Sequence, residues 1–341
     1  MVFNAARTTC IDLFLSTFGP EFMIGTCAPE GDTSRTPLEK YNEMSVELLQ
    51  EECAEHGIEW NASNRVGREY YSMADGRNLS ALRWGQAKPE LLLLHGGAQH
   101  AHAWDAVALA LGCPLLALDL PSHGHSDAAK DGVHDPSSLA EDIAAVLDQA
   151  ACSAMMVCGA SLGGLASISL ASLRPDLVRR LVLVDVTPDI VNKKAPRSAE
   201  FQCECQALPT FGELLLRMCQ RHPTLSESSL RRMLMHSLVV SPEDGLCRWR
   251  HERHPRRHPR RSAFAKLWGQ LDSIDVPVML VRGTTPASLV DDADAEELRQ
   301  RVPMARIEYA QGGGHRLHIE QPAALAAMLE SFIDPDTECE H

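Results

Sequence analysis

The chain has 341 residues, of which 45% are apolar and 23% charged, and 32 basic against 46 acidic side chains give a formal net charge of −14. These proportions are typical of globular proteins and exclude a disordered, collagen-like or disulfide-scaffold chain. The negative charge argues against general nucleic-acid binding and against docking on anionic membranes. The length predicts two domains, or one large α/β domain with an insertion.

Eleven cysteines are scattered along the chain without a repeating spacing. Such usage is typical of reduced thiols, so we expect a cytoplasmic protein. No apolar run reaches the roughly 18 residues of a membrane span, and Asp12 within the apolar stretch 10–18 disfavours a cleaved signal peptide. Cys203 and Cys205 with His222 offer too few ligands for zinc. We therefore expect no metal and no organic cofactor.

The first 62 residues differ from the rest of the chain. They mix short apolar patches with turn residues and contain one helical pattern over 37–56. They carry no chemical motif, so we interpret residues 1–62 as an N-terminal extension, partly helical.

From residue 63, short apolar runs alternate with helical patterns. The predicted strands cover 91–95, 114–119, 154–158, 181–185, 276–281 and 305–310, with 79–84 and the segment before it as antiparallel edge strands. The predicted helices cover 101–111, 136–150, 163–173, 293–301 and 322–332. Continuous apolar runs belong to strands buried on both faces. The pattern predicts an α/β fold, a mostly parallel twisted sheet flanked by helices, over residues 63–187 and 272–336, with 337–341 as a tail.

Residues 188–271 interrupt this alternation. The interval contains no strand pattern but two amphipathic helical patterns, 211–221 and 226–239. An insertion at this point would lie over the carboxyl edge of the sheet, where open α/β folds bind ligands. We therefore predict a helical cap, with Met233 lining a substrate pocket. The arginine- and histidine-rich run 248–261 is interpreted as solvated surface, with anionic-substrate recognition or nucleic-acid contact as alternatives.

The candidate nucleophile is Ser161, in the sequence Gly159-Ala160-Ser161-Leu162-Gly163. This G-x-S-x-G pattern follows a predicted strand and precedes a predicted helix, which is the context that supports it. Glycines on both sides remove side chains that would collide in the sharp turn. The amide of Leu162, at the helix start, would face the oxygen anion that forms in the reaction.

A second oxyanion donor is predicted in the turn His95-Gly96-Gly97, after the strand run 91–95. A glycine pair lets the backbone approach a ligand closely, so we assign the amide of Gly97 as the partner of Leu162. His95 and His123, both in loops after predicted strands, are candidate substrate-binding residues that shape the site.

The candidate base is His315, which follows three glycines after the last predicted strand. A histidine on a glycine-rich loop there can reach the carboxyl edge of the sheet. His318, three residues further on, is the alternative.

The carboxylate that would orient this histidine has two candidate positions. The loop after the strand 276–281 carries Asp291 and Asp292, which also suit the start of the next helix. Asp185 instead ends a buried strand run, where a carboxylate needs a partner. We favour Asp185 and keep Asp291 or Asp292 as the alternative.

Together these motifs resemble the α/β-hydrolase superfamily, over about residues 68–334. The carrying motifs are His95-Gly96-Gly97, Gly159–Gly164, Gly314-His315 and the segment Asp119–Ser126, which is similar to the family's D-x-P-G-x-G-x-S loop with Ser122 in place of a glycine. Some members place the acid 24 residues after the serine, and 185 − 161 is 24 here. The resemblance therefore implies a triad of Ser161, His315 and Asp185.

The function predicted is a serine hydrolase that cleaves a small-molecule carboxylic ester or thioester through an acyl-enzyme intermediate. A carbon–carbon bond hydrolase or cofactor-free peroxidase with the same triad is one alternative. A non-catalytic binding protein of the same fold is another. We expect no nucleic-acid or membrane partner, and a monomer or homodimer.

Overall fold

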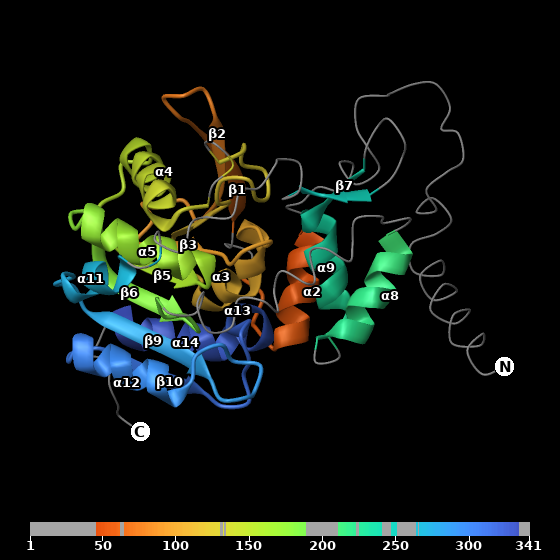
Figure 1. Cartoon of the computed structure of the whole chain (residues 1–341). Helices are drawn as coiled ribbons and strands as arrows, with labels where there is room; N and C mark the ends of the chain where they lie inside the picture. The colour runs from red at the N-terminus through yellow and green to blue at the C-terminus, as the bar shows by residue number, and fades with distance from the viewer. Residues whose placement is uncertain are drawn as a thin grey trace.

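The computed structural model of the chain describes residues 46–61, 65–129, 132, 134–188, 211–222, 225–240, 247–250, 264 and 266–333. Its centre is a twisted sheet of eight strands in the order β1-β2-β4-β3-β5-β6-β9-β10 (Figure 1). The strands are β1 (Val66–Ser72), β2 (Asn78–Trp84), β3 (Leu91–Leu94), β4 (Leu115–Leu118), β5 (Met155–Ala160), β6 (Val178–Val184), β9 (Val278–Gly283) and β10 (Arg306–Ala310). At one edge, β2 pairs antiparallel with both β1 and β4. The strands β4, β3, β5, β6, β9 and β10 run parallel to one another.

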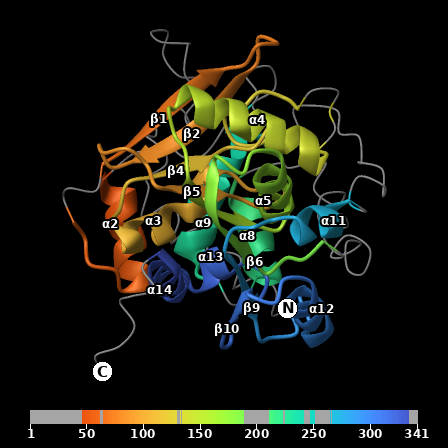
Figure 2. The same cartoon turned by 90° about the vertical axis from the view of Figure 1, so that its left-hand side faces the viewer.

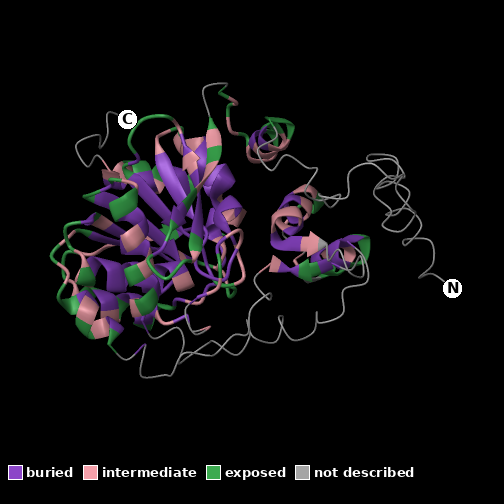
Figure 3. Cartoon of the chain, turned by 90° about the horizontal axis from the view of Figure 1, so that it is seen from above, coloured by how far each residue is buried: buried purple, intermediate pink, exposed green. Residues whose placement is uncertain are grey.

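Helices cover both faces of this sheet, so its strands are apolar on both sides (Figure 2). In β3, Leu92 and Leu94 belong to one hydrophobic core, and Leu91 and Leu93 to the other. The first core also contains residues of α4 (Pro136–Gln149), α5 (Leu162–Leu173), α11 (Leu267–Asp272) and α12 (Asp292–Arg301). The second contains residues of α2 (Val46–His56), α3 (Asp105–Leu111), α13 (Leu317–Glu320) and α14 (Pro322–Ile333). Buried residues therefore fill the sheet and the inner faces of its helices (Figure 3).

This architecture confirms the predicted fold class. The predicted strands and helices of the core each appear within about three residues of their expected bounds, as is normal for element ends. One predicted helix, 101–111, is divided into a 3-10 turn, η2 (Ala101–Trp104), and α3.

The insertion 188–271 is more varied than predicted. It contains the two expected helices, α8 (Phe211–Arg221) and α9 (Glu227–Ser237), but also β7 (Leu238–Val240) and β8 (Cys247–Trp249), which pair antiparallel. Sequence patterns missed these strands because three residues are too few to show a period. These elements share a small hydrophobic core of their own. In contrast, α11 at the end of the interval packs on α5 in the main body.

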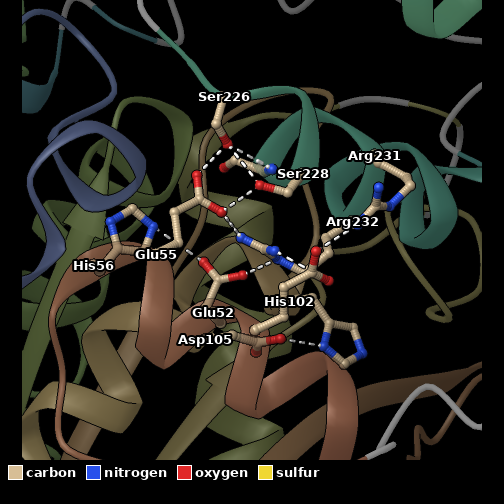
Figure 4. Close-up of polar contacts among 11 residues, drawn as sticks. Glu52, Glu55, His56, His102, Asp105, Ser226, Ser228, Arg231 and Arg232 are labelled. Atoms are coloured by element: carbon tan, nitrogen blue, oxygen red, sulfur yellow. Dashed lines mark hydrogen bonds and ion pairs between the residues drawn. The ribbon is translucent and has the colours of Figure 1, made fainter. Parts of the chain in front are cut away.

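Helix α2 connects this inserted segment, the predicted cap, to the main body. Leu49 and Cys53 on one side of α2 join the core around α3. On its other side, Glu52 and Glu55 form ion pairs with Arg232 of α9, whose side chain is 6% exposed (Figure 4). Ser226 and Ser228 also donate hydrogen bonds to Glu55, as Figure 4 shows. The predicted N-terminal extension therefore contains a helix that contacts both the core and the cap.

Other parts of the predicted extension, the tail 337–341 and most of the run 248–261 lie outside the described residues. Among the helices that are described, none combines the length and apolar character needed to cross a bilayer.

Candidate active site

Ser161 lies at the sharp turn between β5 and α5. Its backbone has φ 48° and ψ −115°, a conformation that side-chain-bearing residues rarely adopt. The turn depends on its glycines: a Cβ atom on Gly163 would lie 2.3 Å from the Leu94 carbonyl oxygen, and one on Gly159 would lie 2.5 Å from the Gly163 carbonyl carbon. The strand, turn and helix predicted around Ser161 are therefore present, with the serine in a strained conformation.

The loop after β3 lies next to this serine. A Cβ atom on Gly96 would lie 3.3 Å from the Cβ of Ser161. The Gly96 amide donates a hydrogen bond to Gln99 Oε1 over 2.8 Å, and the Ala98 amide donates one to His123 Nε2 over 3.0 Å. Among the described residues, the amide of Gly97, which lies between Gly96 and Ala98, has no hydrogen-bond acceptor. The Leu162 amide begins α5 and has no acceptor within the helix. Both predicted oxyanion donors therefore remain available.

His315 contacts Asp185 across the carboxyl edge of the sheet. The loop after β10 places His315 Nδ1 2.8 Å from Asp185 Oδ2. Asp185 itself is fully buried directly after β6, with φ 49°. The His315 side chain is 27% exposed, so its ring reaches the surface of the site. This arrangement leaves Nε2 of His315 for a second partner.

Three further groups satisfy the buried Asp185 carboxylate, and one of them is the Gly283 amide, which donates to Oδ1 over 3.3 Å. Ser288 donates its hydroxyl to Oδ1 over 2.5 Å, and the Leu289 amide donates to Oδ2 over 2.8 Å. Ser288 is not among the site residues that the sequence predicts. It lies in the loop after β9, the same loop that carries the alternative acids, and its hydroxyl supports Asp185 instead. Its only sequence signal is a serine in a loop at the carboxyl edge of the sheet.

The alternative acids stabilise a helix start. Asp291 is the N-cap of α12: its side chain accepts from the Asp294 amide over 3.0 Å, and the Asp294 carboxylate accepts from the Asp291 amide over 3.0 Å. Asp292 forms an ion pair with Arg282. The described contacts thus give both residues partners other than His315.

His318, the alternative base, is buried and 2% exposed. Burial lowers the pKa of His318 to about 3, so the imidazole is neutral at physiological pH. Its Nε2 lies 3.2 Å from Gln99 Oε1, and its ring lies 4.6 Å from the Trp104 ring. His318 therefore forms part of the wall behind the Gly96 loop.

His95 and His123 are buried under the loops of the site. His95 Nδ1 lies 2.7 Å from the Gly96 carbonyl oxygen, and its Nε2 accepts the Leu120 amide over 3.0 Å. His123 Nδ1 lies 2.9 Å from the Pro121 carbonyl oxygen while Nε2 accepts from Ala98. Since both ring nitrogens of each residue are occupied, these contacts support a role in shaping the loops. Direct contact with substrate stays a prediction.

Asp119 stabilises the loops that surround the site. Its carboxylate is fully buried, pairs with Arg68 over 2.7 Å and accepts the Ala101 amide over 2.7 Å. Burial opposes its charge, but Arg68 and the neighbouring histidines hold the pKa of this carboxyl well below its usual range. A charged Asp119 therefore fixes the loop after β4 to the start of η2.

Met233 lies in cap helix α9, where it lines a small cavity against η2. The Met233 carbonyl oxygen lies 3.2 Å from His100 Nε2, so α9 is bonded to the main body at this point. Contact of the Met233 side chain with substrate remains a prediction.

Comparisons with known proteins agree with this geometry. A sequence model of the alpha/beta hydrolase family matches residues 91–328. The chain belongs to this family.

Two curated relatives are esterases. The chain is 38% identical to esterase Rv0045c of Mycobacterium tuberculosis over 263 residues, which cover 75% of this chain and 86% of that protein. It is 30% identical to the pimeloyl-[acyl-carrier protein] methyl ester esterase of Nitrosomonas europaea over 264 residues, covering 72% and 95%. A solved structure of the M. tuberculosis esterase, concerned with its transition metal inhibition, superposes with a TM-score of 0.74 at 35% identity over 84% of this chain and 97% of the other.

Proposed function

We propose that the chain is a carboxylic ester hydrolase that acts on small-molecule esters or thioesters through an acyl-enzyme at Ser161. The observation that carries this proposal is the strained Ser161 turn at the same sheet edge as the His315–Asp185 hydrogen bond of 2.8 Å. Similarity to two proteins named as esterases supports an ester substrate. The proposal includes a cytoplasmic location, for which the cysteines without disulfide partners among the described residues are the support.

In this proposal Asp185 accepts a hydrogen bond from the Nδ1–H group of His315 and so fixes the ring tautomer. Nε2 then carries a lone pair, which removes the proton of the Ser161 hydroxyl as its oxygen attacks the carbonyl carbon. The amides of Gly97 and Leu162 donate to the oxyanion that forms. Loss of one such donor costs about 100- to 1000-fold in rate. The protonated His315 gives its proton to the leaving alcohol or thiol. It then deprotonates the water that attacks the acyl-enzyme, and returns this proton to the Ser161 oxygen as the acid leaves.

The cap forms the outer wall of the proposed substrate site. Helix α9 is held against η2 by the His100 contacts to the Met233 carbonyl oxygen and, over 3.0 Å, to Ser237 Oγ. The acyl selectivity of the enzyme is therefore proposed to depend on α9.

A serine-directed fluorophosphonate tests the nucleophile. We expect one adduct, mapped by mass spectrometry to the peptide that contains Ser161, and none in Ser161→Ala. The variant should lose aryl-ester hydrolysis by about 10³-fold or more, as triad serines do. Ser167→Ala, whose hydroxyl is buried within α5 and bonds to the Gly164 carbonyl oxygen, is the matched control and should label like the wild type. An adduct on another serine would refute the proposal, and turnover of a β-diketone or of peroxide alone would favour the alternative reactions.

A further inference from the structure

A cavity of about 40 Å³ lies between the cap and the main body, where α2, η2–α3 and α9 meet. Its walls contain an unusual number of groups with lone pairs: His100, His102, Asp105, His236, His318 and Glu52. Figure 4 shows His102 and Asp105 beside the ion pair of Glu52 with Arg232. The proposed mechanism uses none of these residues.

Three of these side chains converge. His102 Nδ1 lies 2.8 Å from Asp105 Oδ2, and the His236 ring stacks on the His102 ring with centroids 3.7 Å apart and planes 14° apart. One ligand atom from each of His102, Asp105 and His236 lies within 4.8 Å of the others. Two of them belong to the main body and the third to cap helix α9.

The Asp105 carboxylate lacks half of its expected partners. Asp105 is only 8% exposed, and Oδ1 is buried without a hydrogen-bond donor. An acceptor left unpaired in this way costs free energy unless a ligand compensates it.

Two neighbouring histidines present the same deficiency. His100 Nε2 faces a carbonyl oxygen, so it carries the proton and Nδ1 is a bare lone pair; this Nδ1 is buried without a donor. His318 Nε2 faces Gln99 Oε1, which already accepts the Gly96 amide, so Nδ1 of His318 is likewise an unsatisfied acceptor. The cavity lining also contains the Arg232 guanidinium, so it is these unpaired acceptors, and not the cavity as a whole, that are suited to a cation.

The two nearby positive charges, Arg232 and Arg68, each have a carboxylate partner, and Arg68 Nη2 also lies 3.1 Å from His102 Nε2. Arg232 is paired with Glu52 and Glu55, and Arg68 is paired with Asp119. Imidazole and carboxylate ligands together favour a first-row transition ion such as Zn²⁺, Co²⁺ or Ni²⁺ over Ca²⁺ or Mg²⁺.

We propose that His102, Asp105 and His236 bind a divalent transition-metal ion that tethers the cap to the main body. Binding through His102 Nδ1 moves the proton of that nitrogen to Nε2, which ends the contact with Arg68 Nη2, and metal–ligand bonds replace the hydrogen bond between His102 and Asp105. Ligands at about 2.1 Å from a tetrahedral ion lie about 3.4 Å apart. The 2.8 Å between His102 Nδ1 and Asp105 Oδ2 must therefore widen, and separations of up to 4.8 Å must shorten by as much as about 1.4 Å. The side chain of His236, half-buried on α9, provides that movement.

Sequence analysis predicted no metal site, because the ligands come from distant segments. His102-Ala103-Trp104-Asp105 has a spacing at which two ligands can share one helical turn, but this pair alone is too few. Only the packing of α9 on η2 adds His236.

Cobalt binding to the untagged full-length chain tests the site. We expect one Co²⁺ per chain at the highest affinity, with d–d absorption bands of a four- or five-coordinate ion and no sulfur-to-cobalt charge-transfer band. His236→Gln and Asp105→Asn should each weaken Co²⁺ binding at least tenfold in titration calorimetry. Co²⁺ should also raise the Tm of the wild type and leave that of His236→Gln unchanged.

The matched control removes the other histidine-rich segment. His251→Ala/His254→Ala/His258→Ala should bind Co²⁺ with wild-type affinity. Loss of binding in this triple variant, a charge-transfer band from cysteine, or unchanged affinity in His236→Gln would each overturn the proposal. None of these measurements depends on esterase activity, so a failure here is distinguishable from failure of the proposed function. If Asp105→Asn does not fold, His236→Gln, which changes a half-buried residue of α9, gives the decision alone.

Discussion

His315 Nδ1 lies 2.8 Å from Asp185 Oδ2, although 130 residues separate them in the chain. Because strands β6 and β10 are parallel, the loops that follow them reach the same edge of the sheet. The loop after β9, the strand between them, supplies Ser288 and Leu289 as further donors to Asp185. The carboxylate is therefore buried with its charge compensated. This geometry makes the choice of acid testable.

We predict that Asp185→Asn lowers turnover of an aryl ester by about 10⁴-fold, the loss known for the equivalent change in a well-studied triad. The amide would present a donor to the ring and favour the wrong tautomer. The control is Asp291→Asn/Asp292→Asn, which should lose less than about tenfold, because these residues cap and flank α12. A large loss in the double variant and not in Asp185→Asn would place the acid after β9. Circular dichroism should first confirm that both variants fold.

The turn that presents Ser161 should not tolerate a methyl group at Gly163. The added Cβ would lie 2.3 Å from the Leu94 carbonyl oxygen, a backbone atom that cannot rotate away. We expect Gly163→Ala to lower the free energy of unfolding by about 3 kcal/mol or to prevent folding. Gly269→Ala is the control, because a Cβ atom at this position in α11 meets no atom within 4 Å. This substitution should change the free energy of unfolding by less than about 1 kcal/mol. Urea titration measures both, and equal stabilities would contradict the described turn.

Removal of the Arg68 charge should destabilise the chain in a pH-dependent way. The pKa of Asp119 is depressed in the folded state, so its charge contributes stability above the ordinary aspartate pKa, and this contribution is lost as the pH falls through the folded value. Arg68→Met should therefore lower the free energy of unfolding by about 3–5 kcal/mol near pH 7 by leaving a buried charge unpaired.

The loss in free energy of unfolding caused by Arg68→Met should become smaller toward pH 5, since the unpaired Asp119 can then take up a proton. Arg83→Met, which removes a half-exposed partner of Glu69, should cost less than about 1 kcal/mol at both pH values. Chemical denaturation at the two pH values makes the comparison. A deficit that does not change with pH would show that Asp119 is not its source.

The contact between α2 and the cap should depend on its acidic side chains. Glu52→Gln/Glu55→Gln would leave the buried Arg232 guanidinium without two of its carboxylates, which should cost about 3 kcal/mol. We expect faster hydrogen exchange in α9 with little change in α5. The control Glu47→Gln changes an exposed residue at the start of α2. If α9 exchanges alike in both variants, the ion pairs do not hold the cap.

The sequence alone determined the sheet, its flanking helices and the Ser161 turn, because each follows from a local pattern. Runs such as Leu91–Leu94 are apolar at every position since helices cover both faces of the sheet. The glycines around Ser161 similarly record close backbone contacts. Asp185 was favoured for a local reason as well, the cost of a carboxylate at the end of a buried strand.

Tertiary structure decided the features that join distant segments. The support of Asp185 by Ser288, the pairing of α2 with Arg232, and the meeting of His236 with His102 and Asp105 each connect residues about 100 or more positions apart. Local patterns contain no information on which loops share a sheet edge or which faces of two helices meet. These contacts depend on how the loops and helices of the cap and the main body pack together. The packing brings close together side chains that belong to no common sequence motif.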